Sequence, residues 1–379
     1  MILREDKRVI CAIRTCYGGG KIWFLHAFLN LLYSVDVNNG ESCCYELPVG
    51  MQNRMYYFSN ISYVDGRIWL IPGYAREIVI FDENTEIFSS FVPNDMNEAN
   101  REKEYIYAID SMNMDRCLVL FPYTDTIIRK FDVETYHQEN IDIKNYIGGE
   151  WYWGNLVIKI SNSECFFTRM RCSDFLYINL KTGEVNIFET ELKDATEISA
   201  VILNKRLYVY TNTVDDPFVY EIDIHSGKIV NKCFLKEVDT NFVKLGSIND
   251  RYLALEYSEK QKTILLSPEL EILNEENNEN ISEEDFAYRF YMGIPWRLWL
   301  QSEGETSYCL PNTGNQIGIY KNANIYSERV FQISIDEEKY DKALTNYKKY
   351  ILRNNYFVSE GKDGEGLRDY LNDIINFYK

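Results

Sequence analysis

A short apolar run recurs along the chain, and it usually opens with a basic residue directly after a turn. Such runs occur at Lys21–Leu25, Arg67–Ile71, Arg116–Leu120, Leu156–Ile160, Arg206–Tyr210, Arg251–Leu255 and Arg297–Leu300. Apolar runs of this length bounded by turn residues are typical of β-strands. The first run begins at residue 21 and the seventh at residue 297, so six intervals span 276 residues and average 46 residues each. The pattern therefore predicts about seven repeated units.

Each unit contains three further predicted strands separated by turn residues. The strand before the run ends in a two-residue hairpin signal, such as Asp65-Gly66 or Gly154-Asn155, of the kind that primed turns use to reach positive φ. The strand after the run ends in a turn with Asp or Asn followed three residues later by Thr or Ser, as in Tyr177–Gly183 and Tyr220–Gly227. A fourth strand follows, for example Ile229–Phe234. We therefore expect four strands in each of seven units.

The third turn of the unit carries an apolar-[Asp/Asn]-x-x-[Thr/Ser]-Gly pattern, with the Gly sometimes lost. This pattern resembles the kelch-like and quinoprotein-like repeats of β-propellers, and the whole resembles uncharacterised bacterial propeller proteins. The period also matches the length of a four-stranded propeller blade. The resemblance covers about residues 8–335 and implies an all-β, seven-bladed β-propeller, with six or eight blades as the alternative. The sixth unit departs from the pattern, because Ser267-Pro268-Glu269 replaces the usual turn.

The two ends of the chain determine how such a ring closes. We expect Arg8–Cys16 as the innermost strand of the first unit and Arg329–Ile335 as the outermost strand of the seventh. No strand is then exchanged between the ends, so the ring closes by face-to-face packing alone. We predict that the chain after Ile335 reinforces this seam or the adjoining face. Residues 1–335 are therefore assigned to the propeller and residues 336–379 to a C-terminal helical tail.

The tail carries two apolar stripes at helical spacing, and a Gly-rich stretch separates them. The first lies in Glu337–Arg353. The second contains Leu367, Tyr370, Leu371, Ile374, Ile375 and Tyr378. Either both stripes pack on the propeller, or the second one docks into a groove of a partner protein.

Charge narrows the classes of partner. There are 58 acidic against 40 basic residues, a net charge of −18, which argues against nucleic acid and against an anionic membrane surface. No apolar stretch of about 18 residues is present, and residues 1–8 carry charges where a signal peptide needs an apolar core. The nine cysteines include no Cys-x-x-Cys pair. We therefore expect a cytoplasmic protein with reduced cysteines and no membrane association.

Residues that carry chemistry are sparse. The chain has only three histidines, and it lacks the nucleophile elbow, the His-Glu-x-x-His motif and the P-loop. The acidic run Glu269–Asp285 reads as a solvated loop that could also recruit a basic peptide. We expect no catalytic residue, no metal and no cofactor.

Candidate binding residues lie in the loops that surround the mouth of a propeller's central channel. Tyrosines and arginines there can stack on a ligand or grip a carboxylate or phosphate. The candidates are Tyr74, Arg76, Tyr123, Asp125, Arg169, Arg171, Asp215, Asp216 and Glu303.

Two classes of function remain open from the sequence. The first is a non-catalytic cytoplasmic scaffold that binds a protein or peptide, for which the charge favours basic character. The second is an enzyme that uses the channel face on a carbohydrate or an acidic small molecule. The scarcity of histidine favours the scaffold.

Overall fold

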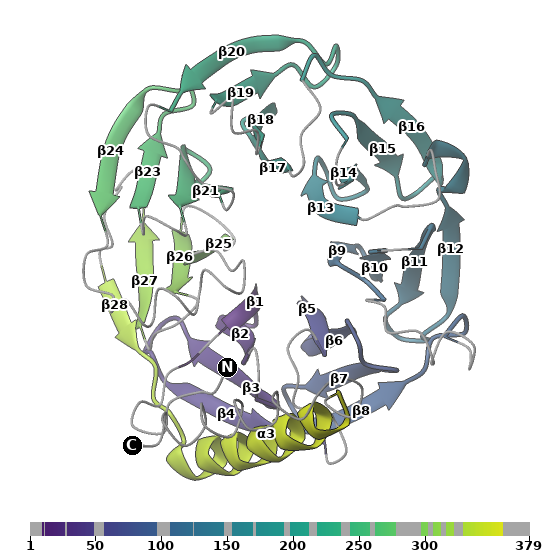
Figure 1. The fold of residues 1–379 in the computed structure, drawn as a ribbon, viewed down its shortest axis with the longest axis vertical. Coiled ribbons are helices and arrows are strands. Elements are labelled where there is room, and N and C mark those ends of the chain that lie inside the picture. The colour runs from purple at the N-terminus through teal and green to yellow at the C-terminus, as the bar shows by residue number, and fades with distance from the viewer. Residues whose placement is uncertain are drawn as a thin grey trace.

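The residues that the structure describes form a ring of seven four-stranded sheets with a helix, α3 (Glu337–Val358), against its outer edge (Figure 1). The structure is a computed structural model. It describes residues 10, 12–26, 29–48, 57–96, 107–123, 125–147, 154–169, 172–192, 198–211, 218–235, 243–257, 262–277, 297–301, 306–311, 316–321 and 329–358. The predicted seven-bladed β-propeller is confirmed.

Each blade contains four strands that are consecutive in the sequence. Blade 1 contains β1 Ala12–Gly18, β2 Lys21–His26, β3 Leu31–Asp36 and β4 Ser42–Glu46, and blade 2 contains β5 Phe58–Val64, β6 Arg67–Pro72, β7 Ile78–Asp82 and β8 Ile87–Phe91. Blade 3 contains β9 Asp110–Met114, β10 Cys117–Phe121, β11 Ile127–Asp132 and β12 Gln138–Asp142. Blade 4 contains β13 Gly154–Lys159, β14 Glu164–Arg169, β15 Phe175–Asn179 and β16 Glu184–Phe188. A short 3₁₀ turn at Lys144–Tyr146 follows β12.

The last three blades have the same order. Blade 5 contains β17 Ile198–Leu203, β18 Arg206–Thr211, β19 Phe218–Ile222 and β20 Ile229–Phe234. Blade 6 contains β21 Val243–Ile248, β22 Tyr252–Tyr257, β23 Lys262–Leu266 and β24 Ile272–Asn277. Blade 7 contains β25 Arg297–Gln301, β26 Thr306–Pro311, β27 Gln316–Lys321 and β28 Arg329–Gln332. The helix α3, Glu337–Val358, then ends the described chain and confirms the first predicted stripe.

One segment expected as a loop contains a strand: Ile272–Asn277, within the acidic run Glu269–Asp285, forms β24.

Two of the predicted strands occupy a different place in their blade. Leu156–Ile160 and Arg297–Leu300 were expected as second strands, but they belong to β13 and β25, the innermost strands of blades 4 and 7. Gly154-Asn155 is accordingly the start of β13 and not a hairpin turn. Apolar strands of equal length look alike in sequence, so the period alone does not reveal which strand of the unit it marks.

The turn between the third and fourth strands explains the repeated Asp or Asn. In blade 3, the Asp132 carboxylate accepts hydrogen bonds from the backbone N–H groups of Glu134 and Thr135 at 3.1 and 2.8 Å. Asp36, Asp82, Asn179 and Asp223 do the same in blades 1, 2, 4 and 5. In blade 6 the Ser267 hydroxyl takes over and accepts from two backbone N–H groups at 3.2 Å. The residue type therefore follows from the need to satisfy these N–H groups.

Aromatic side chains fill the wedges between blades. Trp23 of blade 1 is fully buried against Phe81 of blade 2, with ring centroids 5.9 Å apart. Trp69 of blade 2 packs in the same way against Tyr136 of blade 3, at 5.7 Å. The high aromatic content thus supplies the contact surface that holds neighbouring blades together.

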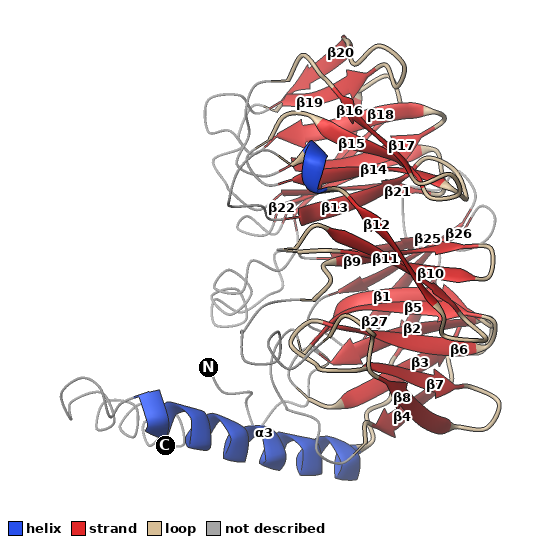
Figure 2. Ribbon diagram, turned by 90° about the vertical axis from the view of Figure 1, so that its right-hand side faces the viewer, coloured by secondary structure: helices blue, strands red, loops and turns tan. Residues whose placement is uncertain are grey.

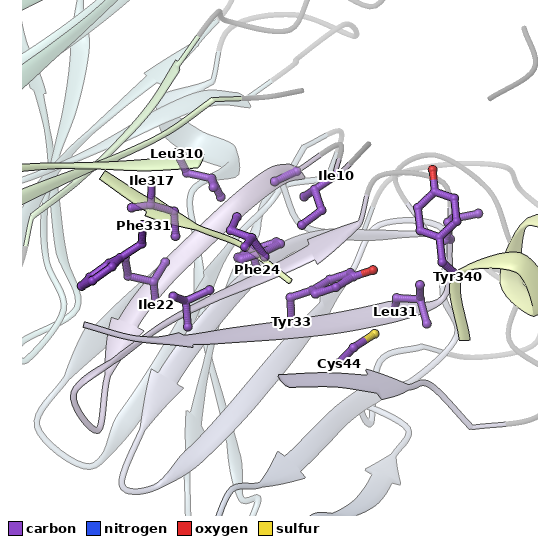
Figure 3. Close-up of a cluster of buried hydrophobic side chains, with 14 of the residues drawn as sticks. Ile10, Ile22, Phe24, Leu31, Tyr33, Cys44, Leu310, Ile317, Phe331 and Tyr340 are labelled. Atoms are coloured by element: carbon purple, nitrogen blue, oxygen red, sulfur yellow. The ribbon is translucent and has the colours of Figure 1, made fainter. Parts of the chain in front are cut away.

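In the described part of the chain, the first and last blades meet without exchanging a strand, as expected. One cluster of buried side chains there contains Phe24 and Tyr33 of blade 1, Leu310 and Phe331 of blade 7, and Tyr340 of α3 (Figure 3). The helix also contributes Ala343, Leu344 and Tyr347. The predicted role of the tail in reinforcing the seam is therefore supported by direct packing.

Polar contacts attach the chain after β28 to the outermost strand of blade 1. The Ser334 backbone N–H donates to the Ser42 hydroxyl at 2.9 Å. Along the first turns of α3, the Lys339 ammonium donates to the Cys44 carbonyl at 2.7 Å, and the Lys342 ammonium pairs with Glu46 at 2.5 Å. Since blade 1 contains the first strands of the chain, these contacts connect the C-terminal segment to the N-terminal blade.

Candidate functional site

The candidate residues lie at one end of the ring. Because the strands of each blade are antiparallel, the connections from second to third strand and from blade to blade share this end, and the tight hairpin turns lie at the other (Figure 2). Tyr74 and Arg76 follow β6, Tyr123 and Asp125 follow β10, and Arg169 ends β14. The other candidates lie outside the described residues: Arg171, Asp215, Asp216, Glu303, Leu367, Tyr370, Leu371, Ile374, Ile375 and Tyr378.

The loop that carries Tyr74 and Arg76 is held by backbone hydrogen bonds. The N–H groups of Gly73 and Ala75 both donate to the Tyr57 carbonyl, at 3.0 and 2.9 Å. Ala75 is buried in the core between blades 1 and 2, while Tyr74 is half-buried and Arg76 is exposed. The Ala75 methyl group thus anchors the loop, and the two candidates flank it.

The loop that carries Asp125 is held by an arginine that is not among the predicted candidates. Arg129 on β11 is buried, with its side chain 3% exposed. Its guanidinium makes two contacts with the Asp125 carboxylate, at 2.5 and 3.3 Å, and donates to the Asp95 carboxylate at 2.6 Å. Two carboxylates therefore neutralise this buried cation, and a bidentate arginine–carboxylate pair fixes the start of β11.

Tyr107 connects this arginine to the neighbouring blade. Its ring lies 4.1 Å from the Arg129 guanidinium carbon, and its hydroxyl donates to Asp95 at 2.8 Å. Its backbone N–H donates to the Gly73 carbonyl at 3.0 Å, directly before Tyr74. Contacts through Tyr107 and Arg129 thus run without interruption from the Tyr74 loop of blade 2 to the Asp125 loop of blade 3.

The ionisation of this network follows from its contacts. Burial alone would raise the pKa of Asp95, but the charge of Arg129 and the hydrogen bonds from Gln138 and Tyr107 lower it below the ordinary value of a carboxyl. Burial raises the pKa of Tyr107, so its hydroxyl stays protonated and remains a donor. We call Asp95, Tyr107, Asp125, Arg129 and Gln138 the Arg129 network.

Arg169, the candidate on blade 4, is also buried and paired. Its guanidinium bonds to the Asp174 carboxylate and donates to the Tyr146 carbonyl at 3.3 Å. The pairing with Asp174 ties the end of β14 to the residue directly before β15, at the end of the loop between these two strands. The predicted ligand contact of Arg169 stays a prediction.

The innermost strands of the first three blades carry polar side chains that hydrogen-bond to the innermost strand of the neighbouring blade. The Arg14 guanidinium donates to the Ser59 carbonyl at 3.2 Å, and the Asn60 amide donates to the Asp110 carboxylate at 2.7 Å. The Ser111 hydroxyl lies 2.9 Å from that of Ser62. Their shared role is to join adjacent blades around the channel.

Groups suited to metal binding are not assembled in the part of the chain that the structure describes: no cluster of three or more His, Cys, Asp or Glu side chains occurs there. His26 is buried and accepts the Leu29 backbone N–H at 3.2 Å, and its ring packs edge-on against Tyr340. His137 and His225 belong to turns between third and fourth strands, at the opposite end of the ring from the candidates. Among the described residues, no helix is long and apolar enough to cross a membrane.

Comparison with known proteins identifies the fold. No family model and no curated protein matches the chain. Several solved structures match it. A virginiamycin B lyase from Staphylococcus aureus is 13% identical to this chain with a TM-score of 0.61, and the match covers 85% of this chain and 98% of the lyase chain. A streptogramin B lyase is 12% identical with a TM-score of 0.60, and covers 82% of this chain and 93% of its own. A chain of a mitotic checkpoint complex is 9% identical with a TM-score of 0.58, and covers 84% of this chain and 92% of its own. At these identities the likeness shows the propeller fold alone.

Proposed function

We propose that the protein is a non-catalytic, cytoplasmic scaffold that binds a protein or peptide through blades 2 and 3. The proposed face is the end of the ring where the loops after β6 and β10 carry Tyr74, Arg76 and Tyr123. The observation that carries this proposal is the Arg129 network, which fixes two neighbouring loops bearing Tyr74, Arg76 and Tyr123. Tyrosine and arginine are the residue types that dominate the binding energy of protein interfaces. Loops that are ordered before binding lose less entropy on association.

The charge of the molecule favours basic character in the partner. The net charge is −18, so long-range attraction would steer a basic protein or peptide toward the ring. Arg76 would then contact an acidic or carbonyl group within an otherwise basic segment. The second stripe of the tail, Leu367–Tyr378, remains a proposed further docking element.

The alternative is an enzyme that acts on a carbohydrate or an acidic small molecule through the same face. In the lyase from Staphylococcus aureus a histidine-to-alanine variant is catalytically inactive. In this chain the Asp125 and Asp95 carboxylates both neutralise Arg129, and His26 is buried against α3. These engagements favour a structural role for the charged groups of the face, and hence recognition over catalysis.

The experiment is an affinity purification from the native host, using the full chain, two variants of the proposed face and one control variant. Arg76→Glu and Tyr123→Ala change the proposed face, and Arg116→Glu is the matched control, since Arg116 is an exposed residue on the hairpin-turn end of blade 3. We expect a partner that the unchanged protein and the control retain and that both face variants lose. A partner retained equally by all four proteins would contradict the proposed face, and the absence of any enriched protein would contradict the scaffold function.

A further inference from the structure

The outer rim of blades 5 and 6 carries a concentration of exposed apolar side chains. Val230 and Phe234 on β20 are 63% and 55% exposed, and Ile272 and Leu273 on β24 are 47% and 42% exposed. The strands β20 and β24 follow each other along the outer edge of the ring (Figure 1). The Asn231 amide donates to the Glu269 carbonyl at 3.1 Å, so the two blades touch at this rim. We call the four apolar residues the rim patch.

A β-bulge lies at the same place in both strands of the rim patch. In blade 5, Ile222 of β19 pairs with Ile229 of β20, but Glu221 pairs with Asn231, so Val230 is the extra residue. In blade 6, Leu266 of β23 pairs with Ile272 of β24, but Leu265 pairs with Asn274, so Leu273 is the extra residue. The other five outer pairs keep a regular register over their described residues. Bulges redirect side chains and are features that proteins retain for a purpose.

Charges of opposite sign flank the two halves of the rim patch. On the blade 5 side, Lys228 and Lys232 are exposed, and the Lys232 ammonium lies 4.5 Å from the centre of the Phe218 ring. On the blade 6 side, Glu269, Glu271 and Glu275 are exposed. The patch is therefore basic at one end and acidic at the other.

We propose that the occupant of the rim patch is a second copy of this chain, related to the first by a two-fold axis between blades 5 and 6. In such an isologous contact, β20 of one copy faces β24 of the other. The lysines then face the glutamates, and Val230 faces Leu273, on both sides of the axis. A uniformly basic partner would be repelled by Lys228 and Lys232, and a uniformly acidic one by the glutamates.

The bulges also favour a closed pair over open-ended assembly. A regular, exposed edge strand can add further strands without limit, and a bulge interrupts the row of free N–H and C=O groups that this needs. Side chains then carry the contact. Since the patch is small compared with a standard protein interface, we expect a reversible, concentration-dependent dimer.

The test is sedimentation velocity of the full chain from low to high micromolar concentration, at about 0.15 M salt so that long-range charge repulsion is screened. We expect a monomer–dimer equilibrium that the variant Val230→Glu/Leu273→Glu abolishes. Both side chains are exposed, so this variant keeps the fold, which circular dichroism verifies. The matched control Ile187→Glu changes an exposed apolar residue on the outer strand of blade 4 and is expected to dimerise normally.

A charge exchange tests the two-fold arrangement itself. The variant Lys228→Glu/Lys232→Glu is expected to weaken dimerisation at least tenfold, and adding Glu271→Lys/Glu275→Lys to the same chain is expected to restore it. A monomer at all concentrations, a dimer unaffected by the Val230 and Leu273 changes, or a failure of the second exchange to restore the dimer would overturn the proposal. The rim patch is separate from the face of blades 2 and 3, so this result is independent of the partner-binding experiment.

Discussion

At the scale of single residues, the turn between the third and fourth strands is governed by one side-chain oxygen and one left-handed residue. The oxygen belongs to Asp, Asn or Ser and accepts backbone N–H groups of the turn. The left-handed residue is Gly183 in blade 4 and Gly227 in blade 5, with φ of +75° and +70°. Glu86 and Tyr136 adopt the same conformation, at φ of 56° and 59°, which explains why the repeat tolerates the loss of its Gly.

The two glycines provide a matched pair for a stability measurement. A Cβ at Gly183 meets nothing within 4 Å, so Gly183→Ala is expected to cost only the left-handed strain, about 1 kcal/mol of unfolding free energy. A Cβ at Gly227 would lie 1.9 Å from the Glu189 carbonyl oxygen. Gly227→Ala therefore forces the backbone to shift and is expected to cost clearly more. Equilibrium denaturation of both variants checks this, and equal losses would contradict the close packing of the Gly227 turn against blade 4.

At the scale of elements, the Arg129 network joins the connection between blades 2 and 3 to β11. Asp95 lies in that connection, and its carboxylate accepts hydrogen bonds from Arg129, Tyr107 and Gln138. The loops of the proposed binding face owe their position to these bonds. Loosening the network is therefore expected to affect stability and binding together.

Asp95→Asn is expected to lower the free energy of unfolding at pH 7 by about 1–2 kcal/mol, since Arg129 keeps Asp125 but loses its second charged partner. The pKa of Asp95 is lower in the folded state than in the unfolded chain. The ionised carboxylate therefore adds its full share to the free energy of unfolding above the unfolded pKa of about 3.9, and this share is lost as the pH falls through the folded pKa. Denaturation series at neutral and acidic pH should show the difference between the two proteins narrowing below about pH 4. A difference independent of pH would contradict the charged state of Asp95.

The elements show what the sequence can reveal and what it cannot. Regularly spaced apolar runs and turn residues predicted the four strands per blade and the blade count, and apolar residues at helical spacing predicted the helix after Ile335, because these features follow from local pattern. The places of β13 and β25 were missed, since strands of one length are interchangeable in a repeat. The Arg129 network was missed because Asp95 lies 34 residues from Arg129. One local feature of the sequence pointed to the ion pair between Arg129 and Asp125. Arg129 follows the apolar Ile128 in a strand expected to be buried, and it lies four residues after Asp125.

At the scale of the whole molecule, the ring depends on a contact between the two ends of the chain. Every blade consists of consecutive strands, so among the described residues no shared sheet connects blade 7 with blade 1. The cluster at the seam combines side chains of both blades with Tyr340, Ala343, Leu344 and Tyr347 of α3. The helix thus supplies the closing contact that strand exchange would otherwise provide.

The most direct test of this account is the melting temperature of the chain without residues 336–379, compared with a chain that lacks only residues 359–379. Burial of each large apolar side chain contributes about 1.5–3 kcal/mol, so loss of the helix is expected to lower the melting temperature by several degrees. The shorter truncation keeps α3 and is expected to retain most of the stability of the full chain. A melting curve unchanged by removal of residues 336–379 would show that the ring closes without its helix and would contradict the account.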